Sequence, residues 1–423
     1  MKQNNVLLVA FNIHGYYSLA LGYLKAYALK DKVLKDNAGI ETIDFCIDCN
    51  DVMQVVYYFT RMEPDVIGLS TYAWNMEKIL QLAELTKHVL PDTKIVLGGP
   101  EAGPIAEKYL QENPQIDIVV RDEGEVTFYE LLRFFVAKDR KLSDIDGISY
   151  RKNEKIFSTD DRALLEDLNE IPSPYLTGIL KPQDKATYLE TYRGCPFRCA
   201  YCFEGKGFPK LRFFSDERVK KEVELITGNQ SIRSFSFVDP VFNLNPKNME
   251  RLSSIMKASV NPDARLHTIE IIMETVDENT IEKLKECNVA SIETGPQTIN
   301  EDTLKNINRQ FDAEKFAAGV CLLLKNHIKV LCDLMLGLPG DTFFRFLRSV
   351  GYIFDLRPNT VVFSTLHVIP GTDLYKNAKK FQMEFDDRPP HYILSNYSFP
   401  FEEIRKAEIM ADSLAKEYNL RLM

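Results

Sequence analysis

Three cysteines near the middle of the chain are the residues best suited to chemistry. Cys195, Cys199 and Cys202 follow a C-x₃-C-x₂-C spacing. Cysteine thiolates are the usual protein ligands of iron–sulfur clusters, and a cubane cluster has more irons than this array has thiolates. One iron is therefore left open to a substrate or cofactor. A structural zinc site would need a fourth ligand, and the sequence offers none at a matching spacing, so the array predicts a reactive [4Fe–4S] cluster.

The flanks of the array resemble the radical S-adenosylmethionine superfamily. Tyr201 precedes the last cysteine, and Tyr192-Arg193-Gly194 precede the first. The resemblance implies that the open iron is chelated by S-adenosylmethionine, which the reduced cluster cleaves to a 5′-deoxyadenosyl radical. It also implies that Tyr201 lies at the cofactor site.

A later stretch is similar to one that holds the same cofactor in this superfamily, and its residues are Glu293, Gln297 and Arg309. An arginine fork suits the methionine carboxylate, and an acid suits the ammonium or the ribose hydroxyls. The alternative for these residues is an exposed ion pair.

Composition limits the classes of protein to consider. With 423 residues, two domains are expected. The net charge of -9, with no basic tract, argues against a nucleic-acid partner. No apolar run has the roughly 18–20 residues of a membrane span. Eight cysteines in so long a chain predict no disulfide framework, which favours a reducing, cytoplasmic setting.

The five cysteines outside the array are expected to be mostly buried small hydrophobic residues. Cys46 and Cys49 have a C-x-x-C spacing at the end of a predicted strand, with no partner pair. We interpret this pair as structural. The others are Cys287, Cys321 and Cys332.

Residues 1–140 alternate apolar strand patterns with helical patterns. Five strands separated by helices predict a flavodoxin/Rossmann-like, doubly wound α/β domain, whose ligand binds at the carboxyl ends of the strands. The predicted strands are Val6–Phe11, Thr42–Cys46, Val66–Ser70, Lys94–Leu97 and Ile116–Val120.

Polar, aromatic and glycine residues follow the third, fourth and fifth of these strands. Two adjacent glycines would let a ligand approach the backbone closely. The order of the turns resembles the cobalamin-binding domain of B12-dependent radical S-adenosylmethionine enzymes, which implies that cobalamin binds here. The candidate residues are Ser70, Thr71, Tyr72, Trp74, Gly98, Gly99, Glu101 and Glu125.

The sequence leaves three alternatives for the lower face of the cobalt: His14, Trp74 or neither residue. B12 proteins that use a histidine carry D-x-H-x-x-G, and here Asn12-Ile13-His14-Gly15-Tyr16-Tyr17 keeps only the histidine. A histidine ligand normally has an orienting partner such as an aspartate. Trp74 could instead face the cobalt, as bulky residues do in some family members, or pack at the junction of sheet and helix.

The rest of the chain predicts a linker, a second domain and a tail. Residues 141–183 are rich in turn signals. Residues 184–385 contain six strands with function-like residues at their ends, which suggests a partial (β/α)₆ radical S-adenosylmethionine barrel. Residues 386–423 end in an amphipathic helix over Phe401–Tyr418, which either closes the barrel mouth or lines a substrate channel.

Together these features identify the chain as similar to cobalamin-dependent radical S-adenosylmethionine C-methyltransferases, acting on an unactivated carbon of a small molecule or peptide. An external electron donor of the flavodoxin or ferredoxin type is implied. The alternatives are a B12-dependent radical cyclase or rearrangement enzyme, a radical enzyme that has lost cobalamin, and a binding protein without turnover.

Overall fold

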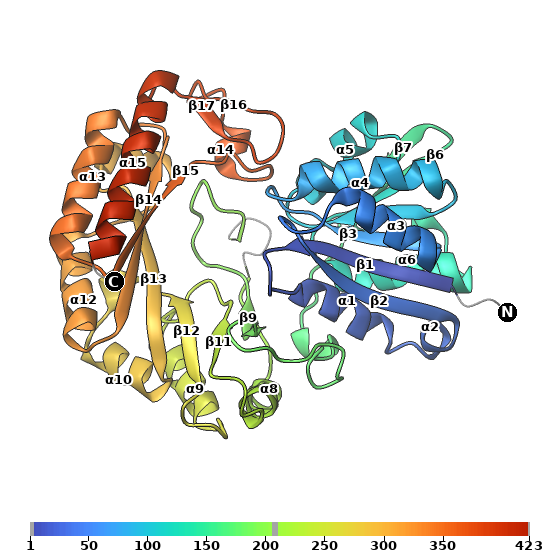
Figure 1. Cartoon of the computed structure of the whole chain (residues 1–423), viewed down its shortest axis with the longest axis horizontal. Helices are drawn as coiled ribbons and strands as arrows, with labels where there is room; N and C mark the ends of the chain where they lie inside the picture. Colours follow the sequence, from blue (N-terminus) through green and yellow to red (C-terminus); the bar gives the residue numbers. More distant parts are fainter. Residues whose placement is uncertain (1–3, 205–209, 422–423) are drawn as a thin grey trace. The chain divides into compact units, whose positions relative to one another are not determined.

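The computed structural model describes residues 4–204 and 210–421. It divides the chain into two compact units (Figure 1). The first comprises residues 1–181 and 388–390, and the second comprises residues 182–387 and 391–423. Within the described ranges, no helix is both long enough and apolar enough to span a bilayer.

The first unit is built on a seven-stranded sheet in the order β2-β1-β3-β4-β5-β6-β7. Strands β1 to β5 are parallel, and their 2-1-3-4-5 order is that of flavodoxin-like folds. The predicted fold class is confirmed. The strands are β1 (Asn4–Asn12), β2 (Ala38–Cys46), β3 (Val66–Ser70), β4 (Lys94–Gly98), β5 (Ile118–Val120), β6 (Ile148–Lys152) and β7 (Lys155–Ser158).

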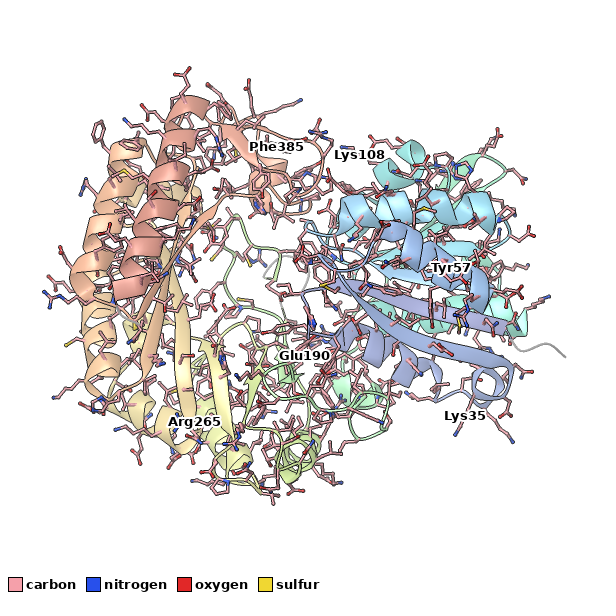
Figure 2. All side chains as sticks on the ribbon, viewed as in Figure 1. Lys35, Tyr57, Lys108, Glu190, Arg265 and Phe385 are labelled. Carbon is pink, nitrogen blue, oxygen red and sulfur yellow. A yellow bond between two sulfur atoms is a disulfide. The ribbon has the colours of Figure 1, made fainter. Side chains whose placement is uncertain are left out.

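Helices cover both faces of this sheet because β1 sends alternate apolar side chains into two cores. Leu7 and Val9 enter the core beneath α3, α4 and α5, whereas Leu8 enters the core beneath α1, α2 and α6. Helix α3 buries Phe59 and leaves Tyr57 exposed (Figure 2). The helices are α1 (Leu19–Ala28), α2 (Lys32–Asn37), α3 (Val52–Met62), α4 (Met76–Val89), α5 (Ala106–Glu112) and α6 (Gly124–Leu132).

The hairpin β6–β7 lies in the stretch that the sequence assigns to a linker, but it extends the first sheet. Strand β6 pairs antiparallel with β5, and Ser149 lies opposite Val119. Arg121 fixes the hairpin, since its guanidinium donates to Ile148 O at 2.7 Å and to Thr159 O at 2.6 Å. The first unit therefore extends beyond residue 140.

The second unit contains a six-stranded parallel sheet in the order β15-β14-β13-β12-β11-β8, with helices along its outer side (Figure 1). This is the predicted partial (β/α)₆ barrel. Its strands are β8 (Tyr188–Leu189), β11 (Ser234–Phe237), β12 (Arg265–Glu270), β13 (Val289–Gln297), β14 (Lys329–Leu336) and β15 (Thr360–Thr365), beside short pairs β9 (Tyr192–Arg193) with β10 (Arg212–Phe213) and β16 (Glu384–Phe385) with β17 (Ile393–Ser395). Its helices are α8 (Asp216–Gly228), α9 (Pro246–Met256), α10 (Glu278–Glu286), α11 (Glu301–Asn306), α12 (Ala313–Lys325), α13 (Phe343–Leu356), α14 (Asp373–Lys376) and α15 (Phe401–Arg421).

Helix α15 packs against the edge strand β15 rather than over the barrel mouth. Asn419 Oδ1 accepts a hydrogen bond from Val361 N at 3.0 Å, and Tyr418 Oη donates to Pro358 O at 2.8 Å. The tail segment before the helix binds the loop after β14, where Asn396 Nδ2 donates to Gly337 O at 2.9 Å. Apart from residues 388–390, the tail is thus part of the second unit, and its helix packs along the edge of the second sheet.

The cysteines outside the array differ in part from their expected burial. Cys287 and Cys332 are buried, as predicted. Cys321 is exposed, so the expectation of burial is wrong for it. Cys46 and Cys49 form a disulfide rather than packing as small hydrophobic residues.

Candidate active site

The chain that leads into the cysteine array is held by a buried aspartate. Asp239 Oδ1 accepts from Thr191 N at 2.7 Å, and its Oδ2 accepts from the Thr191 hydroxyl at 2.5 Å. Burial raises the pKa of Asp239 to about 6. Tyr192 provides a second attachment for this segment, because its hydroxyl donates a hydrogen bond to Val241 O at 2.7 Å. The loop carrying Cys195 therefore starts from a rigid point.

The three cysteines are partly buried and unbridged. Burial raises the pKa of the Cys195 thiol, and it raises the pKa of the Cys202 thiol to about 11. Charge on Cys199 raises both further, so the three thiols lie close enough to interact. Among described residues, no three His, Cys, Asp or Glu side chains converge on a single ion. In a cubane the protein ligands bind separate irons, one thiolate to each.

The turn after α11 fixes the cysteine loop. Ala200 N donates to Ile307 O at 2.8 Å, and Asn308 Nδ2 donates to Arg198 O at the same distance. Arg309 Nη1 lies 3.6 Å from Cys199 Sγ and 3.1 Å from the Tyr201 hydroxyl. Two predicted cofactor residues, Tyr201 and Arg309, are thus brought together beside a predicted cluster ligand.

Two polar atoms at this place are buried without a partner. Arg309 Nη2 donates to Gly295 O. However, neither Arg309 Nε nor Gln297 Oε1 has a hydrogen-bond partner within residues 4–204 and 210–421. Leaving such a group unpaired costs about 1–3 kcal/mol. A ligand that offers an acceptor to Nε and a donor to Oε1 would remove that cost, and an amino acid carboxylate with its ammonium offers both.

The absence of a side chain at Gly295 allows Gln297 and Asp333 to lie close to its backbone. A Cβ at this position would lie 2.1 Å from Gln297 Nε2 and 3.0 Å from Asp333 Cβ. The β13–β14 register shifts between Thr294 and Gln297, and Gln297 has φ +65°. A register shift of this kind is typical of a β-bulge, which changes the direction of side chains and is common near functional sites.

Three carboxyls on adjacent strands line the inner side of the sheet. Glu270 on β12 lies opposite Glu293 on β13, and Asp333 on β14 interacts with Glu293. Burial and then the charge of Glu293 raise the pKa of Glu270 to about 7 and that of Asp333 to about 8. We call Glu270, Glu293 and Asp333 the acid row. Carboxyl groups in this arrangement could accept hydrogen bonds from a cation or from hydroxyl groups.

At the carboxyl edge of the first sheet, Thr71 and the turn after β4 interlock. Thr71 N donates to Gly98 O at 2.8 Å, and Ala102 N donates to the Thr71 hydroxyl at 3.3 Å. Buried Glu101 accepts from the Tyr109 hydroxyl at 2.6 Å. The group that closely approaches Gly99 is therefore Thr71, whose carbonyl oxygen would lie 2.3 Å from a Cβ there. This packing explains why position 99 is a glycine, and binding of cobalamin at this turn stays a prediction.

Substituting Gly99 with alanine is expected to destabilise the first unit by about 3 kcal/mol, since φ is +131° and the added Cβ overlaps Thr71. Gly98→Ala is the matched control, because its nearest neighbouring atom, Val120 Cβ, is 3.6 Å away. It should cost less than about 1 kcal/mol. Urea unfolding of the cofactor-free variants measures both, and equal losses would contradict the packing argument.

Trp74 lies in the turn after β3 and stacks on Tyr72 with ring centroids 4.2 Å apart. It is 58% exposed, so the interpretation that it packs the sheet–helix junction is wrong. Asn75 holds this turn, since its Oδ1 accepts from Tyr72 N at 2.8 Å and its Nδ2 donates to Ser70 O at 3.1 Å. Ser70 and Glu125 are buried at the same edge, and His14 is exposed.

Comparison with known proteins gives two matches in the expected order. Residues 28–132 match the B12 binding domain, and residues 189–353 match the radical SAM superfamily. The chain belongs to the cobalamin-dependent radical S-adenosylmethionine family. Family members use a [4Fe–4S] cluster, S-adenosylmethionine and cobalamin, so the predicted cofactors and the prediction of an enzyme are confirmed.

Relatives in this family are distant in sequence and close in fold. An uncharacterized methyltransferase of Pyrococcus horikoshii is 27% identical over 85% of this chain and 78% of its own length. The cobalamin-dependent radical SAM methyltransferase TokK of Streptomyces tokunonensis is 24% identical over 98% of this chain, which spans only 62% of TokK. The structure of the methyltransferase TsrM from Kitasatospora setae, with cobalamin and a [4Fe–4S] cluster, matches with a TM-score of 0.74 at 18% identity, covering 96% of this chain and 81% of TsrM.

The residues present fit the family's cofactors. Cys195, Cys199 and Cys202 would hold the cluster, and the unpaired atoms of Arg309 and Gln297 fit the amino acid part of S-adenosylmethionine. Sequence reasoning assigned no role to four residues that shape these sites, and they are Asn75, Asp239, Glu270 and Asp333. For the three acids, a position within or directly after an apolar strand is a usable signal.

Proposed function

We propose that this enzyme is a C-methyltransferase that acts on an unactivated carbon of a small molecule or peptide. The observation that carries the proposal is that Arg309 Nε and Gln297 Oε1 are buried without partners among the described residues, with Arg309 beside Cys199. Gln297 lies on β13, the strand that also carries Glu293 of the acid row. When bound, the cluster supplies an electron to S-adenosylmethionine, and cobalamin supplies methyl-transfer chemistry. The methyltransferase relatives support this assignment.

The chain's own residues would orient S-adenosylmethionine by charge. The Arg309 guanidinium, anchored through Gly295 O and the Tyr201 hydroxyl, would bind the methionine carboxylate. Gln297 Oε1 would accept from the ammonium, and the acid row would accept from the ammonium or the ribose hydroxyls. These contacts would hold the amino acid part of the ligand beside the cysteine loop.

In the first unit, we propose that Trp74 rather than His14 meets the lower face of the corrin. The stacked Tyr72 and Trp74 rings present a flat, exposed apolar surface at the carboxyl edge of the sheet. In histidine-ligated B12 proteins an aspartate stands two positions before the histidine, and in this chain Asn12 stands there instead. Asn12 Nδ2 donates to Asp44 at 2.6 Å.

Affinity for S-adenosylmethionine is expected to rise from pH 6 to pH 8. The raised pKa values of Glu270 and Asp333 (about 7 and about 8) mean that these carboxyls are protonated at pH 6, and binding a cation requires them to release protons. For each proton released, Kd should fall by up to about tenfold per pH unit. Equilibrium dialysis of reconstituted protein at pH 6, 7 and 8 measures this.

Asp333→Asn serves as the control for that titration. It removes one ionisable carboxyl while leaving the titration of the ligand's own amino group unchanged, so the pH dependence should become shallower. The same slope in the variant and the parent would mean that the acid row does not face the ligand's cation.

The function is tested by incubating the reduced, reconstituted enzyme with methyl-labelled S-adenosylmethionine and candidate small molecules or peptides. We expect 5′-deoxyadenosine together with corrinoid-dependent label in an organic product. An altered product that carries no label would instead indicate a cyclase or rearrangement enzyme. Equal labelling of the product with and without corrinoid would overturn the role of cobalamin.

We further propose a one-electron donor of the flavodoxin or ferredoxin type, because the cluster must be reduced before each cleavage. A cytoplasmic location stays a prediction from composition.

A further inference from the structure

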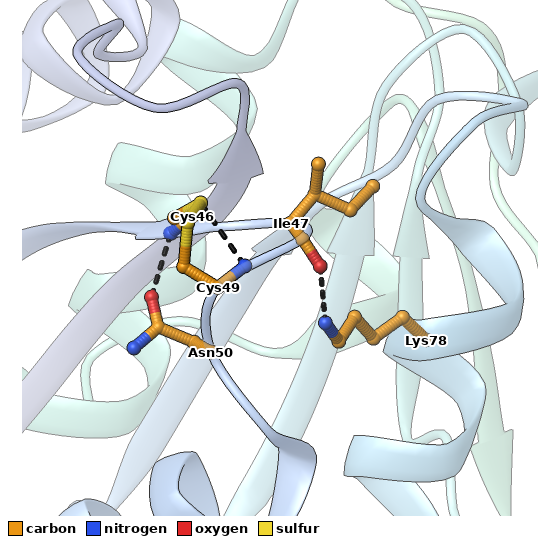
Figure 3. The surroundings of a disulfide bond; sticks show 5 residues. All are labelled: Cys46, Ile47, Cys49, Asn50 and Lys78. Carbon is orange, nitrogen blue, oxygen red and sulfur yellow. Dashed lines mark hydrogen bonds between the residues drawn. A yellow bond between two sulfur atoms is a disulfide. The ribbon is translucent and has the colours of Figure 1, made fainter.

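A disulfide between Cys46 and Cys49 lies at the end of β2, outside the residues assigned to the proposed function (Figure 3). Cys46 is the last residue of β2 and lies opposite Asn12, the last residue of β1. Both strands end at the carboxyl edge of the parallel sheet. Cys49 is exposed and Cys46 is half-buried, so reagents in solution can reach one sulfur more easily than the other.

The loop that carries the disulfide is held by hydrogen bonds that do not depend on it. Cys46 N donates to Asn50 Oδ1 at 2.8 Å, and Asn50 N donates back to Cys46 O at 3.0 Å. Ile47 N donates to Asn12 O at 2.8 Å, and Lys78 Nζ donates to Ile47 O (Figure 3). With the loop folded in this way, the two sulfurs stay close when the bond opens, so closure can be reversible.

A role as a structural staple is weak for this bond. A disulfide stabilises the folded state mainly by restricting the unfolded chain, and this effect grows with the length of the loop that the bond closes. The loop here has a sequence separation of only 3. The hydrogen bonds around Asn50 and Ile47 already fix the turn. The pair therefore contributes more through its chemistry than through chain entropy.

We propose that Cys46 and Cys49 form a reversible thiol–disulfide exchange site for low-molecular-weight thiols. An incoming thiolate attacks the exposed Cys49 Sγ, forming a mixed disulfide, while the bond to Cys46 breaks and its electron pair stays on Cys46. A second thiolate attacks the external sulfur and releases Cys49. Two thiols are oxidised to one disulfide, the protein disulfide gains two electrons, and the two protons that the thiols release pass through solvent to Cys46 and Cys49.

The surroundings favour Cys46 as the leaving sulfur. Cys49 N donates a hydrogen bond to Cys46 Sγ at 3.1 Å, and this bond stabilises a thiolate at Cys46. The Lys78 ammonium, bound to the carbonyl of Ile47, adds positive charge to the same loop (Figure 3). Exposure directs attack to Cys49, and hydrogen bonding assists departure of Cys46. The exchange needs none of the proposed cofactors.

The test equilibrates the full chain anaerobically with mixtures of reduced and oxidised glutathione, followed by acid quenching, alkylation and mass spectrometry. One tryptic peptide, residues 36–61, contains both cysteines. We expect it to change between doubly alkylated and unalkylated forms, with a second-order dependence on reduced glutathione. Two cysteines that stay alkylated at every ratio, or that are glutathionylated independently, would overturn the proposal.

Variants test the direction of attack. Cys46→Ser should accumulate glutathione on Cys49, whereas Cys49→Ser should accumulate far less on half-buried Cys46. Cys321, exposed on α12, is the internal reference for an isolated thiol, and its modification should depend on glutathione to the first order. Equal glutathione uptake by the two variants would overturn the assignment of Cys49 as the attacked sulfur.

Discussion

Replacing Cys199 with alanine is expected to reduce the formation of 5′-deoxyadenosine to background and to remove the visible absorption of the cluster. The three thiols of the array are the predicted cluster ligands, and Cys199 also accepts a contact from Arg309 at 3.6 Å. Loss of one thiolate leaves a second iron without a protein ligand. Iron analysis and product chromatography after anaerobic reconstitution measure the effect.

Cys321→Ala is the matched control for this experiment. Cys321 is an exposed free thiol on α12, away from the array in sequence and fold, so its variant should keep both iron and turnover. Circular dichroism checks that both variants fold. A Cys199→Ala protein with the parent's iron content and turnover would mean that another residue ligates the cluster.

Replacing Arg309 with lysine is expected to raise the Kd for S-adenosylmethionine by about 10- to 100-fold, the equivalent of one charge-assisted hydrogen bond of about 1.5–3 kcal/mol. Lysine keeps the positive charge but lacks the planar guanidinium group. In Arg309, the Nε atom of that group is buried and has no partner among the described residues. Cluster absorption should persist because the cysteines are unchanged. Equilibrium dialysis with reconstituted protein measures the Kd.

Arg405→Lys provides the control, since Arg405 forms an ion pair with Glu408 on the exposed side of α15 and should leave the Kd unchanged. Two outcomes would contradict the assigned role of Arg309. An unchanged Kd would place the methionine carboxylate elsewhere. Loss of iron together with affinity would show that Arg309 mainly supports the cysteine loop through Cys199 and Tyr201.

The sequence by itself determined the order of the elements and the cluster loop. Strand β3 (Val66–Ser70) has the predicted bounds because apolar period and turn signals are local properties of the chain. The C-x₃-C-x₂-C spacing likewise needs no tertiary contact to be read. The family and its cofactors follow from such local patterns, since the residues that carry them are close in sequence.

Only the tertiary structure decided which distant residues meet. Strand register places Glu270 beside Glu293, and neighbouring β14 contributes Asp333, so three acids that are separate in the sequence form one row. The turn after α11 delivers Arg309 to Cys199, 110 residues away. Pairing of β6 with β5 likewise turned an expected linker into part of a sheet. Pairing and register depend on long-range packing, which no local pattern specifies.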